Sequence, residues 1–156
     1  MKPVENKTAR RVQRLLGSDY QVVEFQRSTR SAADAAEAIG CDVSQIAKSL
    51  MFRQADENPV LIIVCGDNRV DEQKAAAVIG NVLYRADADF VKLNSGFSIG
   101  GVPPVGHRVP PIVILDHHLR NLDTIWAAAG TPNAVFCLTP KQLAGLTHGA
   151  FEDIAE

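Results

Sequence analysis

The sequence predicts an α+β fold in a single domain. Short strand patterns and short helix patterns follow one another irregularly, which differs from the repeating strand–helix–strand units of a parallel α/β fold. The chain has 156 residues, and its hydrophobic content of 46% is enough to fill one core. Because no internal repeat, linker or low-complexity segment divides the chain, we expect one domain over residues 1–156.

The helices are predicted from capping residues and terminal glycines that bound apolar repeats. They are a helix that begins near Thr8 and ends at Gly17, a helix capped by Ser31 that stops at Gly40, residues 71–79, residues 87–93, and a helix opened by Thr139 and Pro140.

The strands are predicted from short runs of β-branched, aromatic and other apolar residues. They are residues 20–25, 45–52, 60–65, 82–84, 112–115, 124–128 and 134–138, with residues 53–58 as a hairpin turn. Residues 60–65 are apolar throughout, so this strand is expected to run through the core. Residues 94–111 form the longest interruption between predicted elements.

The first predicted helix has an apolar side and a basic stripe. The apolar side consists of Ala9, Val12, Leu15 and Leu16, and the stripe of Lys7, Arg10, Arg11 and Arg14. The whole chain has 16 basic and 18 acidic side chains, so it lacks the electric field of a protein that coats nucleic acid. The stripe is either a local contact for an RNA backbone or a solvated face, and the solvated face is the commoner case.

Composition argues against a metal site, a disulfide framework and a membrane anchor. The three cysteines are widely spaced and odd in number, so reduced thiols are expected. Asp116, His117 and His118 follow a predicted strand, where neighbouring side chains point to opposite faces, and we expect no metal there. No apolar run has the length of a signal peptide or a membrane span, so a cytoplasmic protein without a membrane partner is expected.

Residues 96–100 match the G-x-S-x-G pattern of serine hydrolases, with Ser98 as the nucleophile. His117, His118, His148 and Asp116 lie downstream as candidate partners. A true nucleophile elbow joins a strand to a helix, whereas a glycine-proline segment that cannot start a regular helix follows Ser98 here. A serine esterase is therefore a weaker alternative.

Two other features are candidates for a ligand site. In residues 100–107, glycines allow backbone N–H groups to approach a ligand and prolines fix the loop, although an ordinary surface turn explains the composition equally well. Lys48 stands in an apolar strand pattern, where it either faces an anion such as a phosphate or points to solvent. Phe25, Trp126 and Phe136 are expected in the core, and Phe25 could also line a pocket.

Three segments together resemble the YbaK/ProX family of trans-acting aminoacyl-tRNA deacylases, which is related to the editing insertion of bacterial prolyl-tRNA synthetase. They are residues 45–52 (QIAKSLMF), 100–107 (GGVPPVGH) and 126–136 (WAAAGTPNAVF). The resemblance implies a mixed sheet, partly closed like a barrel and flanked by short helices. It also implies a hydrolase that acts without a cofactor on the ester bond of mischarged tRNA, with a small amino acid attached. The implied partner is the acceptor end of aminoacyl-tRNA, with an aminoacyl-tRNA synthetase as a second candidate partner.

The resemblance also implies roles for individual residues. Lys48 takes the place of the family lysine and would hold the 3′-terminal phosphate or the ester region. Backbone N–H groups of Gly100, Gly101 and Val102 would bind the carbonyl oxygen and the developing oxyanion, while the terminal ribose hydroxyl of the substrate activates the water. Further substrate-binding candidates are Phe25, Ser49, Val102, Pro103, Gly106, His107, Ala128, Thr131 and Asn133. Ala128 departs from several relatives, which have a polar residue there, and Thr131 and Asn133 are candidates to replace its polar contacts. A non-catalytic module that binds acceptor ends or a synthetase with the same pocket is the main alternative.

Overall fold

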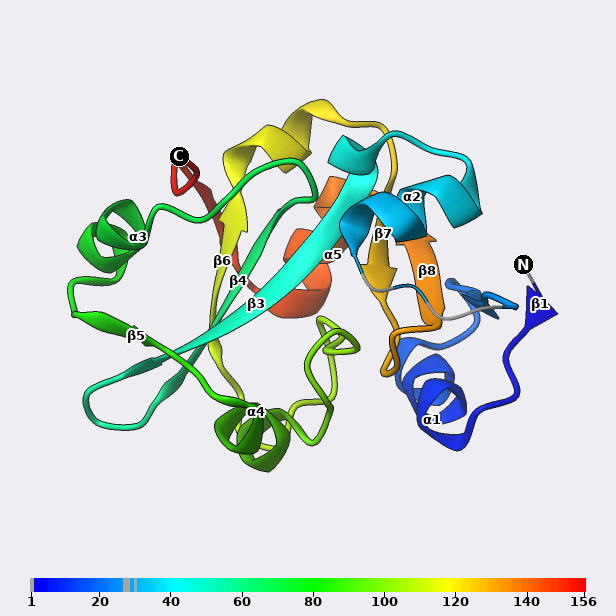
Figure 1. Cartoon of the computed structure of the whole chain (residues 1–156), viewed down its shortest axis with the longest axis horizontal. Coiled ribbons are helices and arrows are strands. Elements are labelled where there is room, and N and C mark those ends of the chain that lie inside the picture. The colour runs from blue at the N-terminus through cyan, green and yellow to red at the C-terminus, as the bar shows by residue number, and fades with distance from the viewer. Residues whose placement is uncertain (1, 27–28, 30) are drawn as a thin grey trace.

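The centre of the fold is a hairpin of two long strands (Figure 1). Figure 1 shows the computed structural model, which describes residues 2–26, 29 and 31–156. The polar segment at residues 55–58 turns β3 (Ile46–Gln54) back onto β4 (Pro59–Cys65) in antiparallel register, as predicted. Every residue of β4 is buried, which agrees with its uninterrupted apolar sequence.

Around this hairpin the described strands form one mixed sheet of nine. Its order is β1-β2-β8-β7-β3-β4-β6-β9, and β5 pairs separately with β3. The other strands are β1 (Lys2–Pro3), β2 (Val22–Glu24), β5 (Leu83–Arg85), β6 (Ile112–Asp116), β7 (Ile125–Ala128), β8 (Ala134–Leu138) and β9 (Ala150–Glu152). The pairs β3–β7, β4–β6 and β6–β9 are parallel and the rest are antiparallel, so the predicted α+β class is confirmed.

Five α-helices occur in the described part of the chain, and each begins at a side chain that accepts hydrogen bonds from the first turn. They are α1 (Lys7–Leu16), α2 (Ala32–Ile39), α3 (Glu72–Ile79), α4 (Ala88–Ser95) and α5 (Pro140–Thr147). Their caps are Asn6, Ser31, Asp71, Asp87 and Thr139. The predicted positions of all five helices are confirmed within a few residues.

The helices divide between different sides of the sheet, and β3 shows this division. Ala47 and Met51 belong to the core cluster that contains residues of α1, α4 and α5. Ile46 packs in the cluster of α2, and Phe52 in the cluster of α3. Because side chains alternate along a strand, Lys48 shares its side of β3 with Ile46 and Phe52, between the α2 and α3 clusters.

Some details differ from the sequence-based prediction. Leu15 was expected on the apolar side of α1, but its side chain is 53% exposed. The buried residues of that helix are Ala9, Val12 and Leu16. The short strands β1 and β9 and the two 3-10 turns, η1 (Val43–Gln45) and η2 (His117–Asn121), were not predicted. β1 and the two 3-10 turns contain no run of apolar residues, and β9 has only Ala150 and Phe151, so none of the four showed the pattern used to predict strands. None of the described helices has the length and apolar content needed to cross a bilayer.

Candidate functional site

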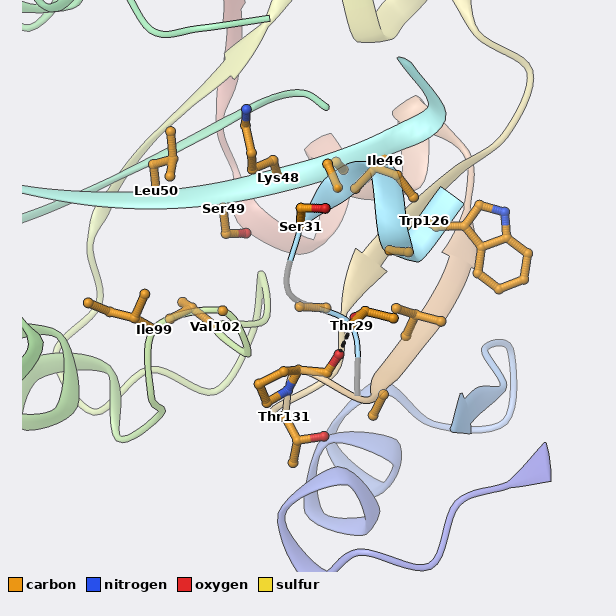
Figure 2. A pocket seen from close by; sticks show the side chains of 18 residues that line it. Thr29, Ser31, Ile46, Lys48, Ser49, Leu50, Ile99, Val102, Trp126 and Thr131 are labelled. Atoms are coloured by element: carbon orange, nitrogen blue, oxygen red, sulfur yellow. Dashed lines mark hydrogen bonds between the residues drawn. The ribbon is translucent and has the colours of Figure 1, made fainter. Parts of the chain in front are cut away.

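The candidate site lies at a split in the sheet beside β3. Along one edge β3 pairs with β7 only at residues 46–47 and with β5 only at residues 52–54. Residues 48–51 therefore pair with β4 alone, and their other edge is open. The loop that includes Ile99, Gly100 and Val102 stands opposite this edge (Figure 2).

Two adjoining cavities occupy the split. The first has a volume of about 250 Å³ and the second about 330 Å³. Both are lined by Lys48, Ser49, Leu50, Ile99, Gly100 and Val102, so these residues form a junction between them. The first cavity continues between α2, β7 and β8, where its lining is mostly small and apolar with hydroxyls from Thr29, Ser31 and Thr131.

Lys48 and Ser49 leave β3 in opposite directions (Figure 2). The Lys48 ammonium donates to the carbonyl oxygen of Asn68 at 2.9 Å and to that of Gly66 at 3.5 Å. An ammonium has three N–H donors, so one is left for a ligand. Burial, followed by the positive charge of Arg69, lowers the pKa of Lys48 below its ordinary value. The Ser49 hydroxyl points toward the loop and is buried without a hydrogen-bond partner among the described residues.

The turn that receives Lys48 is held by the buried carboxylate of Asp116. One carboxylate oxygen accepts from the Cys65 N–H at 3.2 Å and from Asn68 Nδ2 at 2.8 Å. The other accepts from the His118 N–H at 3.0 Å. Burial raises the pKa of Asp116, but these hydrogen bonds outweigh it, and the pKa lies below its ordinary value. Asp116 therefore positions Asn68, and Asn68 positions Lys48.

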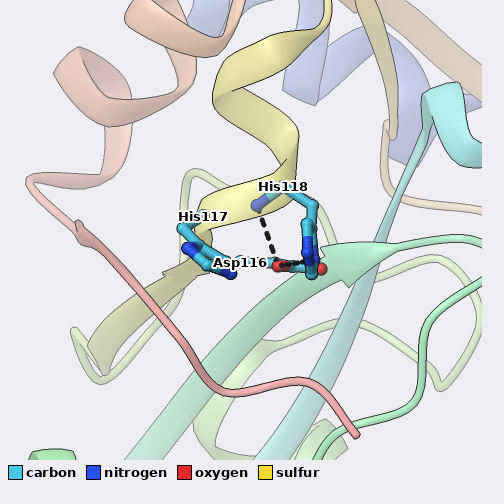
Figure 3. Close-up of side chains that lie close together, drawn as sticks. All are labelled: Asp116, His117 and His118. Atoms are coloured by element: carbon cyan, nitrogen blue, oxygen red, sulfur yellow. Dashed lines mark hydrogen bonds and ion pairs between the residues drawn. The ribbon is translucent and has the colours of Figure 1, made fainter.

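The predicted geometry of the Asp116–His117–His118 segment is wrong. Its side chains do not alternate across a strand, because Asp116 caps η2 and the chain turns into a 3-10 helix (Figure 3). The ligand atoms of all three residues lie within 4.8 Å of one another. His118 Nδ1 lies 3.1 Å from Asp116 and 3.0 Å from Asn68 Nδ2, so the cluster forms its own hydrogen-bond network.

The loop at Gly100 and Gly101 approaches the backbone of Thr131 closely. A Cβ on Gly101 would lie 2.7 to 2.8 Å from backbone atoms of Thr131, and the Gly101 carbonyl accepts from the Gly130 N–H at 2.9 Å. Gly100 has a φ of +92°, which favours glycine. The Gly101 N–H donates to the Ser98 carbonyl at 3.0 Å. Within the described residues the N–H groups of Gly100 and Val102 donate to no other group, which leaves them available to a ligand.

Contacts at Gly106 and His107 hold the rest of the loop against neighbouring segments. The His107 ring nitrogen Nε2 lies 2.7 Å from the Pro103 carbonyl oxygen, and the ring rests near Phe97 at a centroid distance of 6.2 Å. Burial lowers the pKa of His107, so the ring is neutral at physiological pH. A Cβ on Gly106 would lie 2.6 Å from a methyl group of Leu15 on α1. These contacts fix the loop in place.

The structure brings half of the sequence-predicted site residues to the cavities. Those that line a cavity are Lys48, Ser49, Gly100, Val102, Ala128 and Thr131. Those that do not are Phe25, Gly101, Pro103, Gly106, His107 and Asn133. Phe25 is buried in the core, where its N–H donates to the Asn133 carbonyl at 2.8 Å. Ser98 is exposed and follows helix α4, so the strand-to-helix setting of a serine nucleophile is absent at this position.

Other lining residues were not predicted as site residues. Thr29 and Pro132 close one end of the first cavity and are joined by a 2.7 Å hydrogen bond from the threonine hydroxyl to the proline carbonyl. Ser31 was recognised only as a helix cap, and Trp126 only as a core aromatic, although it is partly exposed. Ile99, an exposed loop residue that lines both cavities, carried no sequence signal for a site, because single exposed apolar side chains are ordinary on protein surfaces.

The basic stripe on α1 is exposed. Lys7, Arg10, Arg11 and Arg14 form no ion pair with any residue that the structure describes. The Arg11 guanidinium lies 5.5 Å from the centre of the Phe97 ring, beside the site loop. The stripe therefore borders the loop that lines the cavities.

Comparison with known proteins gives consistent matches. The model of the aminoacyl-tRNA editing domain family matches residues 26–146. YwhH of Bacillus subtilis, a protein named as uncharacterized, is 37% identical over 125 residues, which cover 80% of each chain. The "Putative Cys-tRNA(Pro)/Cys-tRNA(Cys) deacylase EbsC" of Enterococcus faecalis is 27% identical over 86% of this chain and 84% of its own. A crystal structure described as a "putative trans-editing enzyme for prolyl tRNA synthetase" has a TM-score of 0.93 and 43% identity, over 98% of this chain and 99% of that one.

Proposed function

The chain belongs to the aminoacyl-tRNA editing domain family, and from this premise we propose that it is a hydrolase that removes the amino acid from mischarged tRNA. The observation that carries the proposal is the junction of the two cavities. The lining that the two cavities share there includes Lys48, whose ammonium has one N–H left for a ligand, and Gly100 and Val102, whose backbone N–H groups donate to no other described residue. The relatives named as a deacylase and as a trans-editing enzyme support the same reaction.

In this reaction the ester carbonyl lies at the junction, within reach of the Gly100 and Val102 N–H groups. Water attacks the carbonyl carbon, the bond from that carbon to the ribose oxygen breaks, and the ribose oxygen takes a proton to leave as a hydroxyl. Each N–H that binds the developing oxyanion lowers the barrier by about 2.7 to 4 kcal/mol. Lys48 binds the negatively charged part of the substrate next to the ester.

The substrate itself supplies the proton acceptor in this proposal. No histidine is among the described residues that line the cavities, and their two carboxylates, Glu72 and Glu156, lie in the second cavity only. The resemblance described above assigns the activation of water to the terminal ribose hydroxyl of the tRNA. This agrees with a site that offers a cation and backbone donors but no side-chain base at the junction.

The first cavity is proposed to hold the amino acid. Its volume of about 250 Å³ and its lining of alanines, Ile46 and Val135 suit a small side chain. Ala128 presents a methyl group where several relatives have a polar residue, while the Thr131 hydroxyl lies in the same lining. The exposed cations of α1 are proposed to contact the tRNA backbone beyond the site. An aminoacyl-tRNA synthetase is a second candidate partner.

A deacylation screen over correctly charged and mischarged tRNAs tests the proposal. We expect release of a small amino acid by the wild-type protein and a loss of roughly hundredfold or more in Lys48→Ala. Lys141→Ala, at an exposed position on α5 outside both cavities, is the matched control and should keep the wild-type rate. An unchanged rate in folded Lys48→Ala protein would contradict the role of the lysine. Wild-type protein that binds charged tRNA and never releases amino acid would show a binding module instead.

A further inference from the structure

Asp116, His117 and His118 bring three groups that can bind a metal ion together outside both cavities. Their ligand atoms, one carboxylate oxygen and one nitrogen from each ring, all lie within 4.8 Å of one another where β6 runs into η2 (Figure 3). A metal was not expected here because side chains alternate along a strand, and the turn into η2 removes that reason. None of the three is among the described residues that line the cavities, so the cluster is separate from the proposed ester site.

The separation of Asp116 and His118 fits two ligands of one metal ion. His118 Nδ1 lies 3.1 Å from Asp116 Oδ1. Zinc binds nitrogen and oxygen ligands at about 2.0 to 2.2 Å, so two ligands at an angle of about 90 to 110° lie roughly 2.8 to 3.6 Å apart. Both atoms carry lone pairs, which repel at this distance unless a proton or a metal ion lies between them. An ion in this position therefore requires little movement of either residue.

Asp116 is a ligand that the fold already holds in place. Its side chain is fully buried, and its Oδ2 atom accepts from the Cys65 N–H and the Asn68 amide. Its Oδ1 atom accepts from the His118 N–H. A carboxylate oxygen has two lone-pair sites, so Oδ1 keeps one for a metal while Oδ2 keeps both of its hydrogen bonds. Outer contacts of this kind fix the orientation of a ligand and strengthen metal binding.

The two histidines give the cluster access to solvent. The exposed fraction of the side chain is 35% for His117 and 51% for His118, and their ring centroids lie 4.4 Å apart. A rotation of the partly exposed His117 side chain brings its nitrogen to the ion. Asp153 adds a second carboxylate at the edge of the cluster, with Oδ1 at 3.8 Å from His117 Nε2 and at 3.2 Å from Lys74 Nζ. The ion replaces the 3.0 Å contact of Asn68 Nδ2 with His118 Nδ1.

We propose that Asp116, His117 and His118 bind a divalent transition-metal ion of the zinc class. Imidazole nitrogens together with a carboxylate are typical ligands of zinc and its first-row neighbours, whereas magnesium and calcium prefer oxygen ligands. The ion holds the Asp116 carboxylate, and through it the Asn68 amide in the turn that receives Lys48. The inference does not rest on the proposed function, because a protein that never deacylates tRNA can still bind this ion.

Zinc binding to the full chain, freed of metal with a chelator, tests the proposal. Isothermal titration calorimetry measures the dissociation constant, and thermal unfolding is followed at increasing zinc concentration. We expect one zinc ion per chain and a melting temperature that rises with zinc. His117→Ala and His118→Ala should each raise the dissociation constant roughly tenfold or more. Magnesium should give no comparable binding, because it does not favour imidazole ligands.

His148→Asn is the matched control, because His148 is exposed at the end of α5 with a φ of 58°, which asparagine also adopts. This variant should keep the wild-type zinc affinity. Cys41→Ser and Cys137→Ser should keep it too, since a loss there would place the zinc on a thiol and overturn the inference. Unchanged affinity in either cluster-histidine variant, wild-type protein that does not bind zinc, or magnesium bound as tightly as zinc would also overturn it.

Discussion

Replacing Asp116 by asparagine exchanges one oxygen of a fully buried carboxylate for an amide nitrogen. Three donors have hydrogen bonds to this carboxylate, namely the N–H groups of Cys65 and His118 and the side-chain amide of Asn68, and the His118 ring nitrogen Nδ1 also lies 3.1 Å from it. In either orientation the new NH₂ group replaces an acceptor that at least one of these donors uses. Asp116→Asn therefore removes a hydrogen bond without removing the groups that need it.

The expected cost follows from these contacts. A donor left without a partner in the interior costs about 1 to 3 kcal/mol, and the bonds that remain lose their charge assistance. We expect the free energy of unfolding to fall by about 2 kcal/mol and the melting temperature by roughly 4 to 8 °C. Because Asn68 also receives the Lys48 ammonium, the deacylation rate should fall in protein that is still folded.

The effect should depend on pH in a defined direction. Burial raises the pKa of Asp116, but hydrogen bonds from Asn68, His118 and Cys65 hold it below the ordinary value. The ionised carboxylate therefore stabilises the fold above about pH 4, and this contribution is lost as the pH falls through the lowered pKa. The stability gap between wild type and Asp116→Asn should be constant near neutral pH and should close in acid.

Urea unfolding followed by circular dichroism, at neutral pH and below about pH 4, measures this gap. Asp19→Asn, at an exposed turn position, is the control and should leave stability within about 0.5 kcal/mol of the wild type. Equal stability of Asp116→Asn and wild type at neutral pH would refute the assigned hydrogen-bond role, and a gap that persists in acid would refute the assigned pKa direction.

Three further predictions concern residues of the cavities and of the loop beside them. Gly101→Ala should lower the free energy of unfolding by about 2 kcal/mol or more in urea titrations, because the added methyl group meets backbone atoms of Thr131 at 2.7 to 2.8 Å; wild-type stability would show that the two segments can separate freely. Ser49→Ala should leave stability unchanged or slightly raised, because its hydroxyl is buried without a partner, and should slow deacylation; a loss of more than about 1 kcal/mol would reveal a missed hydrogen bond. Arg69→Ala removes a like charge and should raise the pKa of Lys48, so the alkaline limb of the enzyme-dependent rate should move to higher pH; a limb that moves to lower pH would contradict the repulsion.

Local signals in the sequence predicted much of the fold. Ser31, Asp71 and Thr139 mark helix starts because capping needs only the next two or three residues, and all three accept the expected hydrogen bonds. The same local chemistry was overlooked at Asp116, which caps η2 and so ends the strand before the histidines. The prediction treated His117 and His118 as part of a strand, although the Asp116 side chain caps η2 at this point.

The cavities could not be derived in the same way. They exist because β7 and β5 pair with opposite ends of β3, and these pairings join residues that are far apart in the sequence. Lys48 was found through family resemblance, whereas Ser31 reaches the first cavity as the cap of α2, and Thr29 lies there beside Pro132, which is far away in the sequence. His107 shows the reverse case, because its position in the loop suggested a ligand contact while tertiary packing turns its ring toward Pro103.

The helix α1 lies outside residues 26–146, the span that matches the family model, yet segments around the site pack against it. A Cβ on Gly130 would lie 3.0 Å from Val12, and a Cβ on Gly106 would lie 2.6 Å from Leu15. Both the segment at Gly130 and the loop at Gly106 therefore pack against this helix. During synthesis α1 emerges before these segments, so Val12 and Leu16 cannot be buried until the later segments have followed. The nascent chain therefore cannot form the complete site until most of it has been made. A chain shortened to the family span would keep Lys48 and lose the support behind its loop.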